Sequence, residues 1–521
     1  MTNEEVTKNI WLNSISNYIN IFLRIVLGLF LFRLLYQGLP REEFGFWALL
    51  WSVFGFGIVF DFGFGFAAVK KVAELSVHGR WDELSRVLST ILFFYLAIGV
   101  FLIAVVVGGS HYLIDFFNVT AGNREPFREI LIYFFVGLAI AFPLGIFPEI
   151  LIGQQRIALT NLLFCSGAVA NFVLIYLAMR LHWGLRRMVV ISLLTAIIPC
   201  LISAVCAMRR LPRVQLHPRL FSFAMIRETM SFSLYAYVGT LSNMILGKTD
   251  QLVISSTLSV AMVAIYQAGA KIGEMFGAFT TQLPETFSPA AAHLHAKGDK
   301  AFLRKLLIDG TRFSVMIATP AYFIGACYME GLLKILTGDK VVPRETFWVG
   351  QILLLWQYTT VITQSVTKRI FMMCGHEKRL MKLGLGEAML NLFLSLAFVL
   401  YFRNVVGVAL GSLIATFFYG WFTIWPWAAR EVNLSGWRLA ETVLLPIWSA
   451  CLPLIAFVLV LRVVPWLDFK SSTLIFLVEC AIAAVVGALC LWYRALTREE
   501  RGHLTVKLGR FIPRQFRGTT A

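Results

Sequence analysis

Residues 10–36 read IWLNSISNYINIFLRIVLGLFLFRLLY, and this stretch decides how the chain folds. A membrane helix needs roughly 20 apolar residues to cross a hydrocarbon core of about 30 Å, and the stretch is long enough to do so. It also resembles a later part of the chain, because a shift of about 219 residues places Ser14 on Ser233 and, still without a gap, Leu88 on Leu307. A hydrophobic chain with two similar halves is typical of a transporter, in which two helix bundles expose one cavity to each side in turn.

The composition excludes a soluble protein. Of the 521 residues 58% are hydrophobic and 14% are charged, and the mean hydropathy is +0.75. Unpaired backbone groups are too costly in lipid, so the spans are expected to be helices, which makes the chain an all-α polytopic membrane protein. We predict about fourteen transmembrane helices, each roughly 20 residues or more, near 10–36, 44–69, 87–108, 129–152, 157–180, 188–208, 229–255, 263–287, 312–336, 345–370, 380–402, 404–428, 441–464 and 472–494.

The repeat predicts the domain organisation. Because six spans separate the two copies, both copies run in the same direction, and their pseudo-two-fold axis is expected to lie along the membrane normal. The predicted parts are an N-terminal six-helix lobe, a cytoplasmic linker, a C-terminal six-helix lobe, a final helix pair and a basic cytoplasmic tail, at 1–208, 209–228, 229–428, 429–494 and 495–521.

The formal net charge of +17 could suggest a nucleic-acid partner, but the positions of the cations exclude it. Lys and Arg gather in alternate loops, which by the positive-inside rule predicts a multi-pass protein of the inner membrane with both termini in the cytoplasm. The loop Arg180 to Arg187 is the exception, since it has three arginines on the predicted outer side. The eight cysteines form no Cys-x-x-Cys pair, so neither a disulfide framework nor a metal site is indicated.

The first predicted helix has a polar stripe. Asn13, Asn17, Asn20 and Arg24 are spaced four, three and four residues apart, which places them on one helix face. A charge at this depth costs at least about 2.5 kcal/mol when it faces lipid, so Arg24 should face protein or a water-filled cavity. We expect the stripe to bind substrate, although intramembrane Asn residues can also simply join helices.

Further polar residues within the predicted spans are candidates for binding or ion coupling. Lys248 and Lys271 are candidate substrate contacts, and Lys271 can pair with Glu274 three residues later. The ion-coupling candidates, which sense H⁺ or Na⁺, are Asp61, Asp250, Glu274 and Glu387, the last with Asn391 four residues on. Each charged residue could instead belong to a structural ion pair.

The tenth predicted helix has a second stripe, in which Gln357, Thr360, Gln364 and Thr367 share a face. Uncharged hydrogen-bonding groups suit a hydroxyl-rich ligand such as a sugar, although ordinary packing of Thr and Gln explains the pattern equally well. Asn161 and Asn171 in the fifth predicted helix are likewise candidates.

Several stretches together resemble the polysaccharide transport family, the O-antigen flippase type within the multidrug, oligosaccharidyl-lipid and polysaccharide exporter superfamily. They are the polar first helix with Arg24, Asp61-Phe62-Gly63, the run Thr249 to Ile254 and the run Val263 to Tyr266. The resemblance extends over nearly the whole chain, but its motifs are loose.

The resemblance implies a two-lobed flippase. Such a protein moves undecaprenyl-pyrophosphate-linked oligosaccharide, the repeat unit of O-antigen, capsule or exopolysaccharide, across the bacterial inner membrane by alternating access. Arg24 matches a first-helix arginine that contacts the pyrophosphate in relatives, and the final helix pair matches a groove for the lipid tail. This chain has few central arginines, so Arg24 and Lys271 are expected to share the anion. A polysaccharide polymerase and a chain-length regulator are the implied protein partners, beside membrane lipids.

Two other classes of function stay open. A multidrug or metabolite cation antiporter of the related exporter type has the same architecture, although it usually has twelve helices. A membrane-embedded polysaccharide polymerase or ligase needs a large outer loop with paired catalytic residues, which the sequence lacks. No Walker A sequence is present, so we expect that nucleotide hydrolysis by this chain does not supply the energy, and coupling to H⁺ or Na⁺ remains open. No metal or nucleophile constellation appears in the sequence, so we expect neither an enzyme nor a cofactor.

Overall fold

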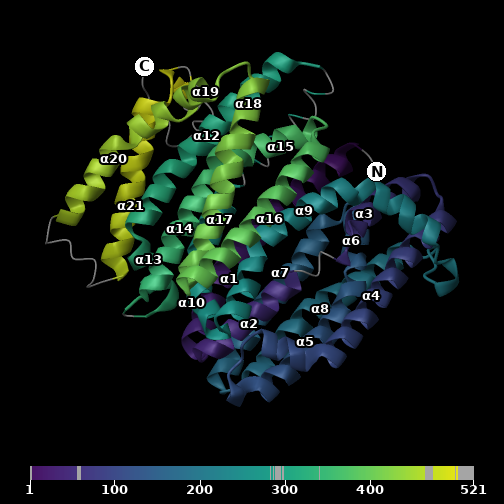
Figure 1. The fold of residues 1–521 in the computed structure, drawn as a ribbon. Helices are drawn as coiled ribbons and strands as arrows, with labels where there is room; N and C mark the ends of the chain where they lie inside the picture. The colour runs from purple at the N-terminus through teal and green to yellow at the C-terminus, as the bar shows by residue number, and fades with distance from the viewer. Residues whose placement is uncertain are drawn as a thin grey trace, which may run out of the picture. The chain divides into compact units, whose positions relative to one another are not determined.

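The computed structural model is built of helices and has no strand among the residues it describes, which are 3–55, 60–281, 283–284, 287, 291, 295, 298–339, 341–463, 473–498 and 500–502 (Figure 1). The first half contains α1 (Asn3–Gly38), α2 (Arg41–Gly55), α3 (Phe64–Val77), α4 (Trp81–Phe116), α5 (Arg124–Leu144), α6 (Ile146–Gly153), α7 (Ile157–Arg180) and α8 (Leu185–Arg210). The rest contains α9 (Phe223–Thr257), α10 (Val260–Thr280), α12 (Lys300–Cys327), α13 (Met329–Thr337), α14 (Arg344–Thr360), α15 (Val366–Met373), α16 (Glu377–Phe402), α17 (Val405–Tyr419), α18 (Trp425–Glu431), α19 (Gly436–Val443), α20 (Leu445–Val463) and α21 (Thr473–Cys490).

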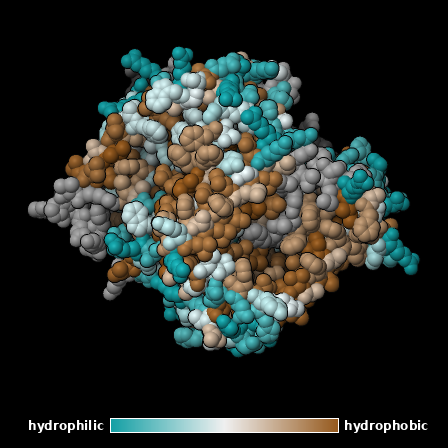
Figure 2. Space-filling model, in the orientation of Figure 1, coloured by the Kyte–Doolittle hydropathy of each residue, from teal (hydrophilic) through white to brown (hydrophobic). Residues whose placement is uncertain are grey.

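The helices confirm a polytopic membrane fold. Within the described residues, each predicted span overlaps one helix or two or three consecutive helices, and parts of the spans 44–69, 263–287, 441–464 and 472–494 lie outside those residues. By length and hydropathy alone, seven described helices can cross a membrane, or up to nine when bent pairs are counted as single spans. Figure 2 shows hydrophobic residues concentrated across the middle of the drawn face and hydrophilic residues near its upper and lower edges.

The second predicted span, 44–69, is not one continuous helix. α2 ends at Gly55 and α3 begins at Phe64, and the backbone turns between them. Phe62 has a φ of 49° and Gly63 a φ of 78°, both in the left-handed region, where a continuing α-helix is impossible. The glycine-rich composition of this span therefore produces a break beside Asp61.

Other predicted spans also depart from regular helices. α12 and α13 meet at an angle of 74°. Five-residue π-helical turns follow α14, α17 and α21, at Val361–Ser365, Gly420–Ile424 and Leu491–Ala495. Hydropathy identifies apolar segments but carries no information on where a helix bends or forms a π-helical turn. The sequence therefore did not locate these features.

The chain divides into two compact units, which are described separately. Unit 1 contains Met1–Gly269, Leu336–Val349 and Glu377–Ala415, and unit 2 contains Ala270–Ile335, Gly350–His376 and Thr416–Ala521. Within unit 1, α4 packs on α5, α1 and α8 pack on α7, and α9 packs on α16. The lobe, linker and tail boundaries at 208, 229, 428 and 494 stay a prediction, and most of the tail, 503–521, lies outside the described residues.

Within unit 2, α12 packs against α20 and α21. Tyr328 and Phe476 lie in the small apolar core between them, where Phe476 approaches Gly331 so closely that a Cβ there would lie 2.1 Å from its ring. Glu479, the one acidic residue of α21, is buried and accepts a hydrogen bond of 2.8 Å from the Tyr328 hydroxyl. The final helix pair is therefore attached to α12 and α13 through polar as well as apolar contacts.

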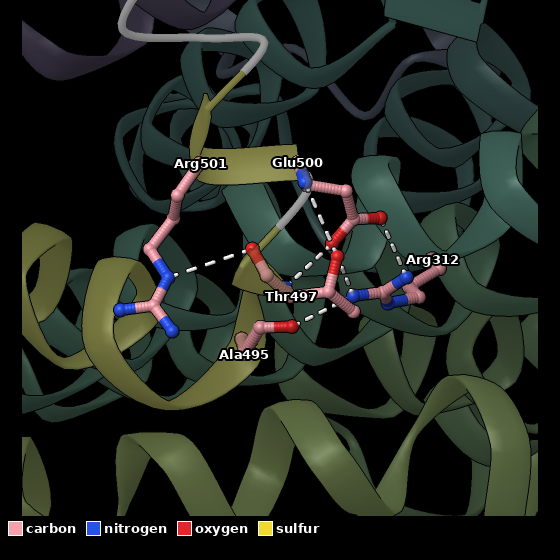
Figure 3. Close-up of polar contacts among 5 residues, drawn as sticks. All are labelled: Arg312, Ala495, Thr497, Glu500 and Arg501. Atoms are coloured by element: carbon pink, nitrogen blue, oxygen red, sulfur yellow. Dashed lines mark hydrogen bonds and ion pairs between the residues drawn. The ribbon is translucent and has the colours of Figure 1, made fainter.

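A second attachment lies at the other end of α21, where Arg312 of α12 holds the chain that follows (Figure 3). Its two Nη atoms donate to the two carboxylate oxygens of Glu500 over 2.9 and 3.0 Å, and Nη2 also donates to the carbonyl of Ala495 over 2.7 Å. Thr497 and Glu500 bond each other reciprocally, with Thr497 N donating to the Glu500 carboxylate and Glu500 N to the Thr497 hydroxyl. This is the pattern of a helix capping box.

Candidate functional site

The polar stripe of α1 faces α7. Asn20 donates to Asn161 Oδ1 over 3.0 Å, and Asn161 in turn donates to Ser16 Oγ over 3.0 Å. Cys165 Sγ lies 3.4 Å from Asn20 Oδ1. Asn20 therefore joins two helices, which is the alternative role that the sequence left open, while Asn13 and Asn17 lie on α1 with side chains outside the described residues.

Arg24 lies one turn beyond Asn20 and is exposed. Its Cζ lies 5.9 Å from the centre of the Phe164 ring of α7, within the range of a cation–π contact. Among the residues that the structure describes, no carboxylate lies within ion-pair distance of Arg24. An intramembrane guanidinium that faces outward beside an aromatic ring, without an anion from the protein, is able to bind an anionic group of a ligand.

Lys248 is a residue of α9 and lies where this helix packs against α2. The hydroxyl of Ser52 donates to the Lys248 carbonyl over 3.0 Å, and a Cβ on Gly55 would touch the Lys248 side chain at 3.7 Å. The half-buried stem of Lys248 thus packs against the end of α2, next to the break in the second span.

Asp250 lies at the centre of a buried polar cluster in unit 1. Its Oδ2 accepts hydrogen bonds from the Tyr266 hydroxyl of α10 and, over 3.3 Å, from Ser412 Oγ of α17. Asn391 of α16 donates to the same Ser412 oxygen over 2.8 Å. Glu387, one turn before Asn391, is only 1% exposed. Two sequence candidates, Asp250 and Glu387, and the Asn391 noted beside them are thus gathered on neighbouring helices.

This cluster has oxygen atoms available for a small cation. Asp250 Oδ1 and Asn391 Oδ1 are buried and accept no hydrogen bond from any described residue. A buried oxygen without a donor is costly, and a bound cation removes that cost. Carboxylate, amide and hydroxyl oxygens are the ligands that hard cations prefer.

Asp61 lies in a second acidic cluster, near the start of α3. Its Oδ1 accepts hydrogen bonds from the Tyr95 hydroxyl of α4 and, over 3.2 Å, from Gly65 N. A Cβ on Gly65 would lie 3.5 Å from Asp61 Oδ1 and 3.7 Å from Glu149 Cγ, so the two carboxylates flank this glycine. The sequence argument missed Glu149, although an acidic residue inside the apolar fourth span was a visible signal.

The predicted pair on α10 is present in unit 2. Lys271 Nζ lies 3.1 Å from Glu274 Oε2, and the two side chains are 25% and 40% exposed. Arg24 and Lys271 belong to different units, so their sharing of an anion stays a prediction.

The side chains of the second stripe are mostly engaged in packing and in hydrogen bonds within the protein. Gln357 lies against Gly277 of α10, where a Cβ would come within 2.8 Å of its Nε2. The Thr360 hydroxyl donates to the Trp356 carbonyl of its own helix over 3.0 Å. Gln364 is 2% exposed within the π-helical turn Val361–Ser365. The positions of Thr360 and Gln364 are thus consistent with ordinary packing, the alternative that the sequence left open.

Comparison with known proteins adds the family and the fold. A family model described as polysaccharide biosynthesis protein matches residues 31–343. The uncharacterized membrane protein MJ1068 of Methanocaldococcus jannaschii is 22% identical over 418 residues, which are 76% of this chain and 80% of that protein.

Among solved structures, the lipid II flippase MurJ in an inward closed conformation has a TM-score of 0.69 at 15% identity, over 96% of this chain and all of that chain. An inward-facing multidrug resistance transporter of the MATE family has a TM-score of 0.64 at 16% identity, over 81% of this chain and 96% of that one. At these identities the likeness shows the fold.

Proposed function

The chain belongs to the polysaccharide biosynthesis protein family, and from this premise we propose that it is a flippase for undecaprenyl-pyrophosphate-linked oligosaccharide in the bacterial inner membrane. In this proposal both termini are cytoplasmic, and the chain works by alternating access without an enzymatic step. A polysaccharide polymerase and a chain-length regulator are its proposed protein partners.

Arg24 is the observation that carries this proposal. A pyrophosphate that crosses a membrane needs a cation in its path, because an unpaired anion is too costly in a medium of low dielectric. Arg24 offers an exposed guanidinium within a membrane helix, and its position is fixed by the bonds of Asn20 to α7. The apolar polyprenyl chain can remain in lipid throughout.

The test is surface polysaccharide in cells that depend on this chain. Arg24→Ala should abolish it at a normal level of membrane protein, whereas Arg24→Lys should keep part of it, because a point charge still attracts phosphate. Arg33→Gln removes a charge from the same helix and is the matched control. Normal display by Arg24→Ala would contradict the assignment of the pyrophosphate to Arg24.

We further propose that the cluster around Asp250 holds the coupling cation, Na⁺ or H⁺. Binding there alters the charge between α9, α16 and α17, and a ligand that prefers one conformation shifts the population toward it. Asp250→Asn keeps a hydrogen-bonding side chain but loses the charge, so it should abolish the response of transport to an imposed Na⁺ or proton gradient. A native protein that is indifferent to both gradients would refute coupling.

A cation antiporter of the MATE type is the second candidate. The similarity of the fold to a MATE family transporter, with a TM-score of 0.64, favours it. Drug resistance conferred by expression, and lost in Asp250→Asn, would support it. Restored polysaccharide display without drug resistance would favour the flippase.

A further inference from the structure

The turn between α7 and α8 is an arginine hairpin, which we define as residues 180–187 with the sequence RLHWGLRR. Its three arginines are exposed. Residues 150–227, which include both helices of the hairpin, contain neither Asp nor Glu. The hairpin lies beside the end of α1, because a Cβ on Gly38 would come within 1.7 Å of Met179 Cε. It therefore lies at the opposite end of α1 from the N-terminus.

Aromatic rings hold each guanidinium of the arginine hairpin. Arg180 donates from Nε to the Tyr176 hydroxyl over 3.1 Å, and its Cζ lies 5.3 Å from the centre of that ring. The Cζ of Arg187 lies 5.5 Å from the centre of the Trp183 ring. A ring contact covers one face of a guanidinium and leaves most of its N–H donors available.

Other arginines at this end of the helices have carboxylate partners. Arg41 pairs with Asp339 at 2.8 Å and Arg124 with Asp115 at 3.2 Å. Arg128 pairs with Glu125 at 3.3 Å, and Arg186 in the hairpin itself pairs with Glu129 at 3.2 Å.

Arg180 and Arg187 differ from these four. Within the described part of the chain neither has a carboxylate within ion-pair distance. The arginine hairpin thus presents two guanidinium groups without a protein anion.

The arginine hairpin ends a helix whose apolar surface is largely uncovered by the rest of the protein and is therefore available to lipid. In its most apolar window α7 is only 11% buried, the least of the seven spanning helices that the structure describes. Next to the arginines, Leu177, Leu181 and Trp183 are 46%, 59% and 37% exposed. Aromatic residues and arginines at the end of a lipid-facing helix lie at the level of the lipid headgroups.

We propose that the arginine hairpin binds the phosphate of anionic phospholipid headgroups, in the leaflet at this end of the helices. Planar guanidinium groups bind phosphate oxygens in a bidentate manner, and the exposed Trp183 and Leu181 contact the acyl region of the same lipid. This explains Arg180 and Arg187 on a side where the positive-inside rule disfavours arginine. A lipid bound here also stabilises the end of α7 beside α1. It thereby stabilises the packing of α7 on α1, the helix that contains Arg24.

The test is a binding titration of the purified full-length protein in neutral detergent with tail-labelled phosphatidylglycerol, read by fluorescence anisotropy. We expect Arg180→Gln with Arg187→Gln to raise the Kd of the highest-affinity phosphatidylglycerol site about 25-fold, or about fivefold for each arginine. A basic residue at a membrane surface contributes about 1 kcal/mol. Lysine at both positions should keep most of the affinity. Arg124→Gln with Arg128→Gln removes the same charge from paired arginines at the same end and should change the affinity less than about twofold.

Labelled phosphatidylcholine and inorganic phosphate test the ligand class. We expect the native protein to bind phosphatidylcholine more weakly, and millimolar phosphate not to displace phosphatidylglycerol. Unchanged binding by the hairpin variant, or an equal loss in the paired-arginine control, would overturn the site. Equal binding of both lipids, or displacement by free phosphate, would overturn the assignment to an anionic lipid. Unchanged circular dichroism and elution volume of each variant establish that it is folded.

Discussion

The contact of Arg312 with the segment after α21 gives the most quantitative prediction. Arg312 and Glu500 are 15% and 25% exposed, and Arg312 makes three hydrogen bonds, two of them to a carboxylate. Breaking a fully buried pair costs about 3–5 kcal/mol. Because this pair is partly solvated, we expect Arg312→Ala to weaken the docking of this segment by about 2–3 kcal/mol.

Hydrogen exchange measured by mass spectrometry on peptides covering 491–502 reports this docking. A loss of about 2–3 kcal/mol should speed exchange there roughly 30- to 150-fold when the equilibrium between docked and open states sets the exchange rate. Arg304→Ala is the matched control, because Arg304 lies on the same helix and contacts the Glu431 carbonyl and the Asn433 amide rather than the segment after α21. Equal exchange in the native protein and Arg312→Ala would refute the reasoning, as would an equal increase in Arg304→Ala.

The same contact predicts a pH dependence. Partial burial raises the pKa of Glu500, but the backbone hydrogen bond from Thr497 and the contacts of Arg312 outweigh it, so the pKa is lower than its ordinary value of 4.5. A carboxyl with a lowered pKa stabilises the docked state above its ordinary pKa and loses this contribution as the pH falls through the lowered value. Protection of 491–502, corrected for intrinsic rates, should therefore fall at pH values below about 4.5 in the native protein and not in Glu500→Gln.

Three further predictions concern packing and polar contacts. Gly331→Ala should lower stability by about 1–3 kcal/mol through its collision with Phe476, and Phe476→Leu should restore part of it in thermal unfolding of the purified protein; no loss would contradict the close approach. Arg41→Ala should lower the free energy of unfolding by less than about 1 kcal/mol, because its pair with Asp339 is exposed. A double-mutant cycle that shows a larger coupling between the two residues would be inconsistent with this. Asn161→Leu should cost about 1 kcal/mol through its lost hydrogen bonds between α1 and α7, and a stability equal to native would show that they contribute nothing.

The sequence could predict the apolar spans and the contacts between residues one helical turn apart. Long apolar runs predicted the spans, and the spacing of Lys271 and Glu274 predicted their ion pair, because both follow from helical periodicity. The intramembrane carboxylates Asp250 and Glu387 were candidates because charge is rare at that depth.

What sequence could not supply is the pairing between distant helices. Asp250 and Ser412 are 162 residues apart, and no periodicity relates them. Helical periodicity also could not show that Gln364 lies in a π-helical turn, Val361–Ser365, where the regular spacing of the second stripe is interrupted. Glu149 was visible as an acidic residue inside an apolar span, but its position across Gly65 from Asp61 follows only from the packing of α6 on α3.

Transbilayer movement of a fluorescent undecaprenyl-pyrophosphate oligosaccharide, in vesicles reconstituted with the full chain, tests the central proposal most directly. The native protein should move the labelled lipid to the opposite leaflet far faster than protein-free vesicles do. Arg24→Ala should slow this movement about 10- to 150-fold, the effect of losing a charge-assisted contact of about 1.5–3 kcal/mol. A native rate equal to that of protein-free vesicles, or an unchanged rate in Arg24→Ala, would contradict the account.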